Sequence, residues 1–492
     1  MKCMRSAIAT SLWFLPVSIY AQSTPPITPE FIVGTALLHG DEAALIDNEA
    51  TTIGSSSKRI DSAFVTTIDG RLAVTDAQAE SSQPFSPNST KGTTLSAGAS
   101  RLFETGTMIR GEVMTSQRDL KFDAPSAAAG KSYETSASLS LRQSLWRNAF
   151  GKAVRLRRDA AALADKGTVD SIADRKSQYA VTVSGLFFHA WQAIAQVRAA
   201  ERRLARQEEL LRITRVKSNR GTAEAPDLLQ VEAGAILAAD RVKDARNQVD
   251  DIWQQLVILL KLPSAYAAMD PTKLDIRLGD VMPTVEASCS EADPASFARM
   301  KSATAAVDAA TAQLAATRSD RSPDVFFEAR YSANGIDAKQ GKSISETTGR
   351  DHPTSSFAIG VEMPLGYPRT DADLQETLRQ KNAAEIRLSQ VRSQYATDRP
   401  ILCTEVKRLQ ERKTALESAL KKTTARAKEE TNRFRLGKID AFNVIQAEND
   451  LTDTQTAIDI LMADLHQVAW RLLYLSDRLV PYMQPYLAAA KS

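Results

Sequence analysis

The residue types that most often carry enzyme chemistry do not converge in this chain of 492 residues. The sequence contains no G-x-S-x-G, H-E-x-x-H, P-loop or C-x-x-C motif, and its four histidines are scattered. Nucleophiles and metal ligands need partners at fixed spacings, because several side chains must meet at one atom. We therefore predict that the protein is not an enzyme and has no catalytic residue, metal site or cofactor.

The cysteines offer little redox or metal chemistry. Cys289 and Cys403 are too few and too distant in sequence for a disulfide scaffold or a metal knuckle. They are able to pair, and the sequence does not decide whether they do. We expect buried or idle thiols.

The first residues predict a secretory signal peptide over residues 1–21. Lys2 and Arg5 precede a mostly apolar stretch, and Ala21 is a small residue suited to cleavage. These two residues also account for most of the formal net charge of +3, so no basic excess remains to indicate nucleic acid as a partner. No run of 18 apolar residues follows, so membrane contact would have to come from strands.

One pattern of charged, amide and glycine residues occurs twice. FRLGKIDAFNVIQAEND, residues 434–450, matches SNRGTAEAPDLLQVEAG, residues 218–234, at an offset of 216. The strand-like endings SASLSLRQSLWRNAFG and SFAIGVEMPLGYPRTD match at an offset of 220. Two independent matches at similar offsets predict a tandem duplication. We assign residues 22–92 to an N-terminal extension with helices, 93–292 to a first repeat and 293–492 to a second repeat.

Long helices must position the repeated pattern. Residues 152–220 and 369–436 contain few helix breakers, and each would span about 100 Å at roughly 1.5 Å per residue. Return helices follow over 226–262 and 441–476, and another helical segment covers 293–318. Helices this long bury their apolar stripes only by lining up as coiled-coil hairpins. The many Arg and Glu residues of the outbound helices predict a solvated face.

Alternating apolar and polar residues predict four strands, typical of a membrane barrel although weak in each segment. They cover residues 107–117, 133–145, 325–332 and 356–365. An ordinary soluble hairpin is an open alternative for the strands alone. We interpret residues 30–79 as two modest helical segments and 81–93 as a linker.

The repeated pattern itself predicts a turn between two helices. Gly221 and Gly437 each follow a basic segment, as at a helix C-terminus closed by a left-handed glycine. Glu224 and Asp440 place a carboxylate where the next helix begins and its N–H groups are free. Each repeat therefore ends in the tip of a helical hairpin.

The pattern [FY]-R-x-G-x-x-[DS]-x-x-[DN]-V-[LI]-x-A-x-x-x-L, present twice, resembles the TolC-type outer-membrane efflux proteins. The resemblance implies a mainly α protein with a small β part. It implies a homotrimer in which four strands per chain close a twelve-stranded β-barrel, and in which the helices form a periplasmic tunnel. Its function would be the outer-membrane exit channel of a tripartite efflux or type I secretion system. Its partners would be a periplasmic adaptor, an inner-membrane pump and outer-membrane lipid.

The resemblance also implies site residues. The hairpin tips would dock the adaptor through Arg220, Gly221, Arg435, Leu436 and Gly437. In the family the second tip carries a pair of acidic side chains that narrows the periplasmic aperture.

By position, that acidic pair falls here on Asn443 and Gln446, which are both neutral. Asp440 remains close, although its carboxylate is equally able to serve only as a helix cap. The gating of this neutral aperture is therefore left open.

A second function class fits the same helices: a secreted periplasmic coiled-coil scaffold or adaptor without channel activity. An adaptor would show lipoyl-like or barrel modules beside one hairpin, and none is visible in the sequence. A scaffold would not need amphipathic strands at matching positions in both repeats. The sequence identifies neither the transported substrate nor the class of pump.

Overall fold

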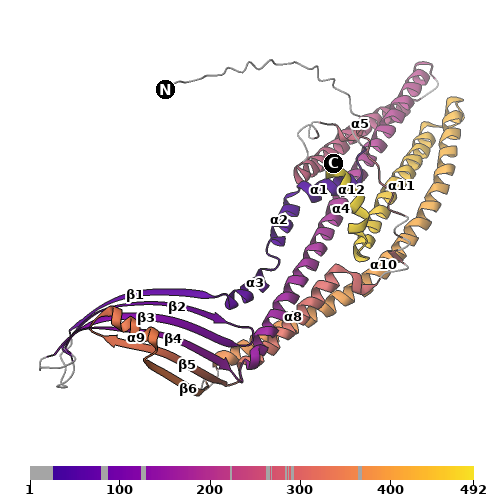
Figure 1. Cartoon of the computed structure of the whole chain (residues 1–492). Coiled ribbons are helices and arrows are strands. Elements are labelled where there is room, and N and C mark those ends of the chain that lie inside the picture. The colour runs from indigo at the N-terminus through magenta and orange to yellow at the C-terminus, as the bar shows by residue number, and fades with distance from the viewer. Residues whose placement is uncertain are drawn as a thin grey trace, which may run out of the picture. The chain divides into compact units, whose positions relative to one another are not determined.

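A computed structural model describes residues 26–78, 87–122, 129–221, 224–261, 266, 269–282, 285, 288–289, 293–363 and 368–491. The predicted signal peptide, residues 1–21, lies outside these ranges. Helices make up most of the described chain, and six strands form one sheet. Figure 1 shows the helices and the sheet. The helices are α1 (Pro29–His39), α2 (Asp41–Ala50), α3 (Ser55–Asp61), α4 (Lys152–Asn219), α5 (Ala225–Leu260), α8 (Ala298–Asp320), α9 (Gln340–Gly349), α10 (Pro368–Arg435), α11 (Ala441–Leu475) and α12 (Leu479–Lys491).

The two outbound helices, α4 and α10, are continuous over 68 residues each, as the sparse helix breakers predict. Pro400 lies inside α10, where it removes one backbone donor. The return helices α5 and α11 have 36 and 35 residues. Both predicted long hairpins are therefore confirmed.

The strands form one antiparallel sheet in sequence order, and Figure 1 shows them side by side. They are β1 (Thr67–Gln78), β2 (Ser89–Leu102), β3 (Thr107–Lys121), β4 (Gly130–Ser144), β5 (Asp324–Asp337) and β6 (His352–Glu362). β4 pairs with β5, so the strands that precede and follow the first long hairpin lie in one sheet. The short helix α9 lies over β4 and β5, where the Thr347 hydroxyl donates to the carbonyl of Thr135 over 2.9 Å.

The expectation of four strands per chain is wrong, because the sheet has six. The segment 67–78 was predicted to be helical and the segment 81–93 to be a linker, yet β1 covers the first and β2 begins at Ser89. β2 is rich in Ser, Gly and Thr, and only its pairing with β1 and β3 makes it a strand. The proposed domain boundary between residues 92 and 93 consequently falls inside β2.

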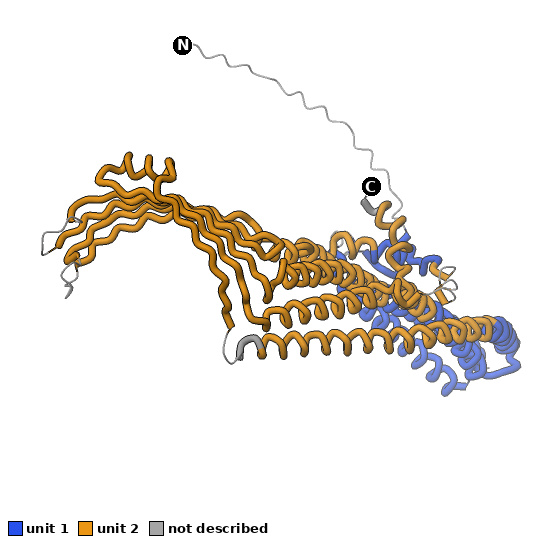
Figure 2. Tube along the Cα trace, turned by 60° about the horizontal axis from the view of Figure 1, so that its bottom comes forward, with its two compact units in different colours: residues 1–33, 186–280, 418–463 blue, residues 34–185, 281–417, 464–492 orange. Residues whose placement is uncertain are grey.

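Two compact units are coloured in Figure 2, and each has its own content. Unit 1 holds residues 1–33, 186–280 and 418–463, which include both hairpin tips. Unit 2 holds residues 34–185, 281–417 and 464–492, which include the whole sheet, α8 and α9.

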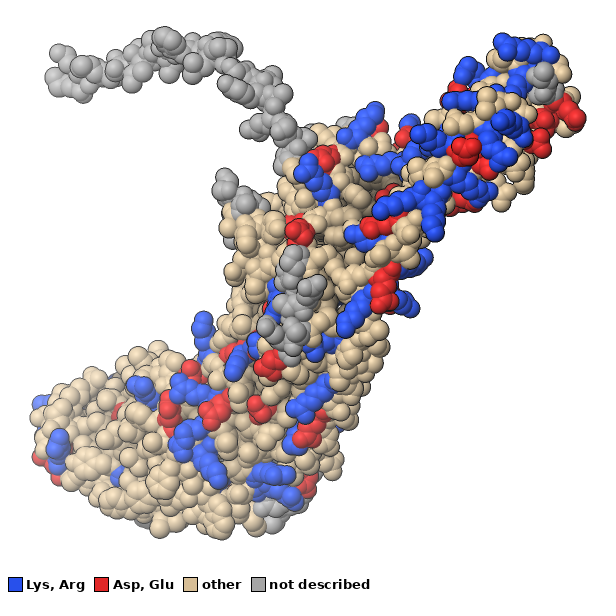
Figure 3. Space-filling model, turned by 90° about the vertical axis from the view of Figure 1, so that its right-hand side faces the viewer, with Lys and Arg blue, Asp and Glu red and all other residues tan. Residues whose placement is uncertain are grey.

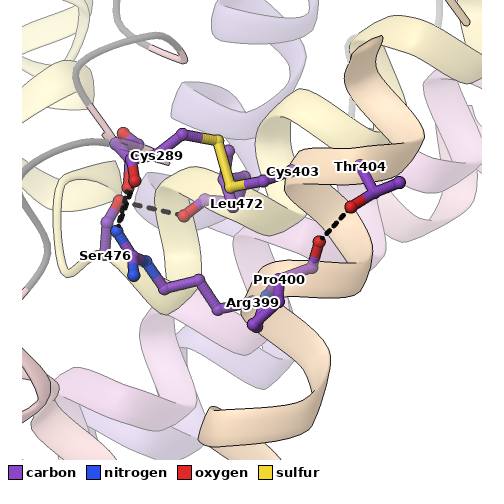
Figure 4. The surroundings of a disulfide bond; sticks show 8 residues. Cys289, Arg399, Pro400, Cys403, Thr404, Leu472 and Ser476 are labelled. Carbon is purple, nitrogen blue, oxygen red and sulfur yellow. Dashed lines mark hydrogen bonds between the residues drawn. A yellow bond between two sulfur atoms is a disulfide. The ribbon is translucent and has the colours of Figure 1, made fainter. Parts of the chain in front are cut away.

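The two cysteines of unit 2 are joined in a disulfide, so the expectation of idle thiols is wrong. Figure 4 shows Cys289 bonded to Cys403 of α10, one turn after Pro400. Beside it the Arg399 guanidinium donates to the carbonyl oxygens of Ser288 and Cys289, over 3.2 and 2.7 Å. The segment around Cys289 is thus attached to α10 by a covalent bond and by two hydrogen bonds.

Candidate functional site at the hairpin tips

Both predicted turns have the backbone conformation that glycine favours. The φ angle is +71° at Gly221 and +72° at Gly437, in the left-handed region. After α10, the N–H of Gly437 donates to the carbonyl of Phe434, and the N–H of Lys438 donates to the carbonyl of Arg433. These bonds satisfy carbonyls that the end of a helix leaves free. The prediction of left-handed glycines at both helix ends is confirmed.

The predicted carboxylate caps are not formed. Glu224 occupies the N-cap position of α5, but its side chain makes no capping hydrogen bond. The Asp440 side chain is exposed before α11, and within the described residues it makes no hydrogen bond or ion pair. Pro226, in the first turn of α5, lacks an N–H group and so reduces the need for a cap. Because the Asp440 side chain is exposed and makes no hydrogen bond to a described residue, its carboxylate is available on the surface of the second tip.

The predicted site residues are exposed at the two turns. At the second tip Leu436 is 70% exposed, and its neighbours Arg435 and Gly437 are exposed as well. At the first tip Arg220 is exposed. Asn443 and Gln446 are three residues apart near the start of α11, and both are exposed. Their spacing places them on one side of the helix, next to the turn that carries Asp440. Whether they line an aperture remains a prediction.

The two hairpins of unit 1 are joined close to their tips by Lys217 and Phe434, which the sequence analysis did not single out. The Lys217 ammonium donates to the carbonyl of Phe434 over 2.7 Å and lies 3.6 Å from the centroid of the Phe434 ring. Burial lowers the pKa of Lys217. Phe434 occupies the aromatic position of the repeated pattern, three residues before Gly437, and this was the available signal.

An apolar cluster lies beneath this contact. Phe434 is 4% exposed and packs with residues from all four helices of the two hairpins. The buried members of the cluster are Leu210, Val231, Phe434, Ala441 and Val444. The ends of α4 and α10 and the starts of α5 and α11 therefore form one packed assembly rather than two separate hairpins.

Charged side chains add further links within unit 1. Arg206 of α4 forms an ion pair with Glu448 of α11, and the Arg203 guanidinium lies 2.8 Å from the Asp453 carboxylate. The Arg203 side chain is only 25% exposed. The prediction that this side of α4 is solvated is therefore wrong at these positions, because α11 supplies carboxylates to the arginines.

The sheet of unit 2 has two chemically different faces. One face, here called the apolar face, carries most of the exposed large hydrophobic side chains of the strands. Its members follow one another through the strand register: Ile68, Leu72 and Val74 on β1, Leu95 on β2, Val113 on β3, Leu139 on β4, Tyr331 on β5, and Phe357, Ile359 and Val361 on β6.

The opposite face, here called the polar face, presents charged and hydroxyl side chains such as Asp69, Arg110, Glu112 and Arg330. Arg110 and Asp69 form an ion pair across it with a distance of 2.9 Å. Figure 3 shows that the surface over the strands has few charged side chains, whereas the helical hairpins carry many. Such alternation across a sheet suits hydrocarbon on one side and water on the other.

The described residues show no group of three or more His, Cys, Asp or Glu side chains that could hold a metal ion. In the same part of the chain, no helix is both long and apolar enough to cross a membrane.

Comparisons with known proteins give one partial sequence match and several structural matches. The sequence model of the outer membrane efflux protein family matches residues 296–474. No curated protein sequence matches the chain.

Solved structures share the fold over nearly the whole chain. The outer membrane protein VceC from Vibrio cholerae is 12% identical, with coverage of 91% of this chain and 95% of that chain and a TM-score of 0.66. The CmeC outer membrane channel of Campylobacter jejuni is 10% identical, with coverage of 98% of both chains and a TM-score of 0.66. The MtrE outer membrane channel of Neisseria gonorrhoeae is 15% identical, with coverage of 92% and 89% and a TM-score of 0.55. Residues 296–474 thus match the sequence model of the outer membrane efflux protein family, and the whole chain has the fold of these outer membrane channels.

Proposed function

We propose that this protein is the outer-membrane exit channel of an efflux or type I secretion system, with its helices in the periplasm. The observation that carries the proposal is the apolar face of the sheet, which runs across all six strands and is covered by α9 only around Thr135 and Gly335. Phe357 and Ile359 are each 75% exposed on it, and burying such side chains in lipid would remove a large apolar area from water. The polar face would line a water-filled passage.

A single chain does not complete such a passage. In the described sheet β1 and β6 are edge strands, and six strands are fewer than the roughly eight needed for a small membrane barrel. A homotrimer would join these edges between subunits. Three copies of a six-stranded sheet would bring eighteen strands, instead of the twelve expected from the sequence.

The helix α5 offers a surface for this self-association. Leu229, Ile236, Leu237 and Ile258 are exposed on it, and the spacing of seven between Leu229 and Ile236 is typical of a coiled-coil seam. The exposed Asp244 and Asp251 lie between Leu237 and Ile258 at the same spacing. A second copy could cover this stripe with α10, in which basic residues outnumber acidic ones.

The exposed tips would dock a periplasmic adaptor, which in turn would connect the channel to an inner-membrane pump. The contact with the adaptor would be made by Arg220, Gly221, Arg435, Leu436 and Gly437. The aperture would be surrounded by Asp440, Asn443 and Gln446. Outer-membrane lipid would surround the sheet. In this proposal the protein has no catalytic activity and no nucleic-acid partner.

Cell fractionation and accessible tags test the proposal against the alternative of a periplasmic scaffold. Tags inserted in the segments 120–132 and 334–355, which join paired strands, should be reachable on intact cells, whereas a tag beside Gly221 should not. The purified protein should be a trimer that conducts ions in a lipid bilayer. A periplasmic soluble fraction without bilayer conductance would support the scaffold and reject the channel.

A further inference from the structure

Unit 2 contains a groove of about 810 Å³ between α4, α8 and α10. Leu163, Lys166 and Asp170 of α4 line it at helical spacing, and Arg392 and Tyr395 do the same from α10. Close packing of α4 against α8 holds one side in place. A Cβ atom added at Gly167 would lie 3.2 Å from the Cβ of Ala305, so these two helices approach as closely as glycine permits.

Two buried polar atoms at the groove lack partners. Tyr395 is only 6% exposed, and its hydroxyl makes no hydrogen bond to any described residue. Its ring packs against Phe297, with 5.7 Å between the ring centroids. The Oδ2 atom of Asp170 is likewise buried without a hydrogen-bond partner in the described chain. Leaving such an atom unpaired costs about 1–3 kcal/mol. A molecule that offers an acceptor to the Tyr395 hydroxyl and a donor to the Asp170 carboxylate would therefore bind favourably here.

The charges around the groove have both signs. Lys166 and Arg392 provide positive charge, and neither forms an ion pair with a described residue. Asp170 and Asp308 provide negative charge from α4 and α8, and Asp293, whose carboxylate accepts from the Ala295 N–H, provides a third negative charge. Lys301 is already engaged, since its ammonium lies 3.6 Å from the Asp477 carboxylate. Charges of both signs therefore face the groove, which favours a ligand that also carries both signs.

Apolar side chains complete the lining and indicate an organic body on the ligand. Leu163, Pro294 and Met300 supply carbon surface, and the small Ala305 and Ala396 leave the space open. The volume falls within the range of about 300–1,000 Å³ that is usual for small-molecule sites.

We propose that this groove binds a small zwitterion. Its phosphate or carboxylate accepts from the Tyr395 hydroxyl and pairs with Arg392 and Lys166, while its ammonium donates to Asp170 and Asp308. A phospholipid with an ethanolamine headgroup and a free aminoalkyl phosphate share this chemistry. The site needs no channel activity, so it stands apart from the proposed function.

Binding to the full-length protein, purified in the uncharged detergent dodecyl maltoside, tests the proposal by titration calorimetry. Phosphoethanolamine should bind saturably with one molecule per chain, whereas ethanolamine and glycerol phosphate, each with charge of one sign, should bind at least tenfold more weakly. Dihexanoyl phosphatidylethanolamine identifies the source. If dihexanoyl phosphatidylethanolamine binds more tightly than phosphoethanolamine, the natural ligand is a lipid. If the two bind equally, the natural ligand is a free zwitterion.

Two variants locate the binding to the groove. Tyr395→Phe removes only the hydroxyl and should weaken binding roughly tenfold, as expected for one hydrogen bond to a charged group. Asp170→Asn should weaken phosphoethanolamine binding without affecting glycerol phosphate. Arg387→Gln, on an exposed part of α10 outside the groove, is the matched control. Absence of saturable binding to the wild-type protein, or equal binding by all three variants, would overturn the proposal. The proposal would also be overturned if no ligand bound and Tyr395→Phe changed the oligomeric state, because the groove would then be a contact between subunits.

Discussion

The Lys217 ammonium donates a hydrogen bond to the carbonyl oxygen of Phe434 across 217 positions of sequence, and it connects the first hairpin to the end of the second outbound helix. That carbonyl lies in the last turn of α10, where it also accepts from the N–H of Gly437 and where a positive charge is favourable. The same ammonium lies over the Phe434 ring. One side chain thus combines three attractive interactions at the point where the hairpins meet.

Removal of this charge should loosen the tips. Lys217→Met keeps an unbranched apolar side chain but loses the hydrogen bond and the cation–π contact, together about 1–2 kcal/mol. We expect higher resting conductance of the purified protein in a bilayer, with an unchanged amount of assembled protein. Lys217→Arg is the matched control and should retain most of the closure. Identical conductance in wild type and Lys217→Met would show that this contact does not restrain the tips.

The geometry of the turns gives a second prediction. A β-branched residue at Gly437 is forced into the left-handed region, at a cost of about 1–2 kcal/mol. No atom lies within 4 Å of a Cβ added at Gly437 or Gly221, so the effect comes from the backbone and not from a clash. Gly437→Val should abolish export while the trimer still assembles, and Gly221→Val should have a milder effect.

Asparagine tolerates the left-handed conformation better than valine, so Gly437→Asn is the control for turn geometry and should retain most of the export. Export is measured as the resistance that each variant restores to a strain lacking the channel, at matched protein levels. Wild-type resistance with Gly437→Val would refute a docking role for this turn.

The helices could be predicted from the sequence, and the strands only in part. Residues 152–220 lack proline and contain few glycines, so a long helix was the simplest local solution. β1 has Ile68, Leu72 and Val74 as apolar residues on one face, but Gly70 and two aspartates, which are rare in strands, interrupt the pattern. Its strand conformation is decided by pairing with β2 over residues 89–100, a non-local interaction.

The contacts at the tips could not be predicted for the same reason. The glycines are determined by local backbone conformation and so were visible in the sequence. The ion pair between Arg206 and Glu448 depends on how two hairpins from different repeats pack, which no local pattern encodes. The disulfide likewise joins cysteines 114 positions apart, and only the folded chain brings Cys289 next to α10.

That disulfide gives a third prediction. A crosslink that closes a loop of this length restricts the unfolded chain and typically contributes about 2–4 kcal/mol to the free energy of unfolding. The double variant Cys289→Ser, Cys403→Ser should therefore melt at a lower temperature in detergent, as followed by circular dichroism. Reductant should lower the melting temperature of the wild type toward that of the variant and leave the variant unchanged. Equal melting temperatures without reductant would show that the bond does not stabilise unit 2.

A fourth prediction concerns the pH dependence of unit 1. Burial raises the pKa of Asp459 of α11, although Arg202 and Arg198 act in the opposite direction. The folded protein therefore binds this proton more tightly than the unfolded chain, so stability falls as pH rises from the ordinary value of 3.8 through the raised pKa.

Asp459→Asn removes this titration. Its melting temperature should exceed that of the wild type at pH 7, and the difference should shrink below about pH 4, where wild-type Asp459 is protonated. Asp240→Asn, on an exposed position of α5, is the matched control. A difference that does not change with pH would mean that Asp459 does not titrate differently on unfolding.

The last prediction concerns the proposed aperture, where the side chains of Asn443 and Gln446 are neutral. Asn443 and Gln446 of three subunits would offer hydrogen-bonding groups but no net charge, and hard cations seek several anionic oxygens. The wild-type channel should therefore be only weakly sensitive to millimolar divalent cations added on the side of the tips.

Asn443→Asp together with Gln446→Glu would place six carboxylates in the trimer and should create strong block by divalent or trivalent cations from that side. The double variant Asn443→Ala, Gln446→Ala is the neutral control and should remain insensitive. The exposed Asp440 carboxylates, which cap no helix, are the competing gate. Tight block of the wild type that disappears in Asp440→Asn would assign the constriction to Asp440, because the charge that binds the cation would then come from the turn and not from α11.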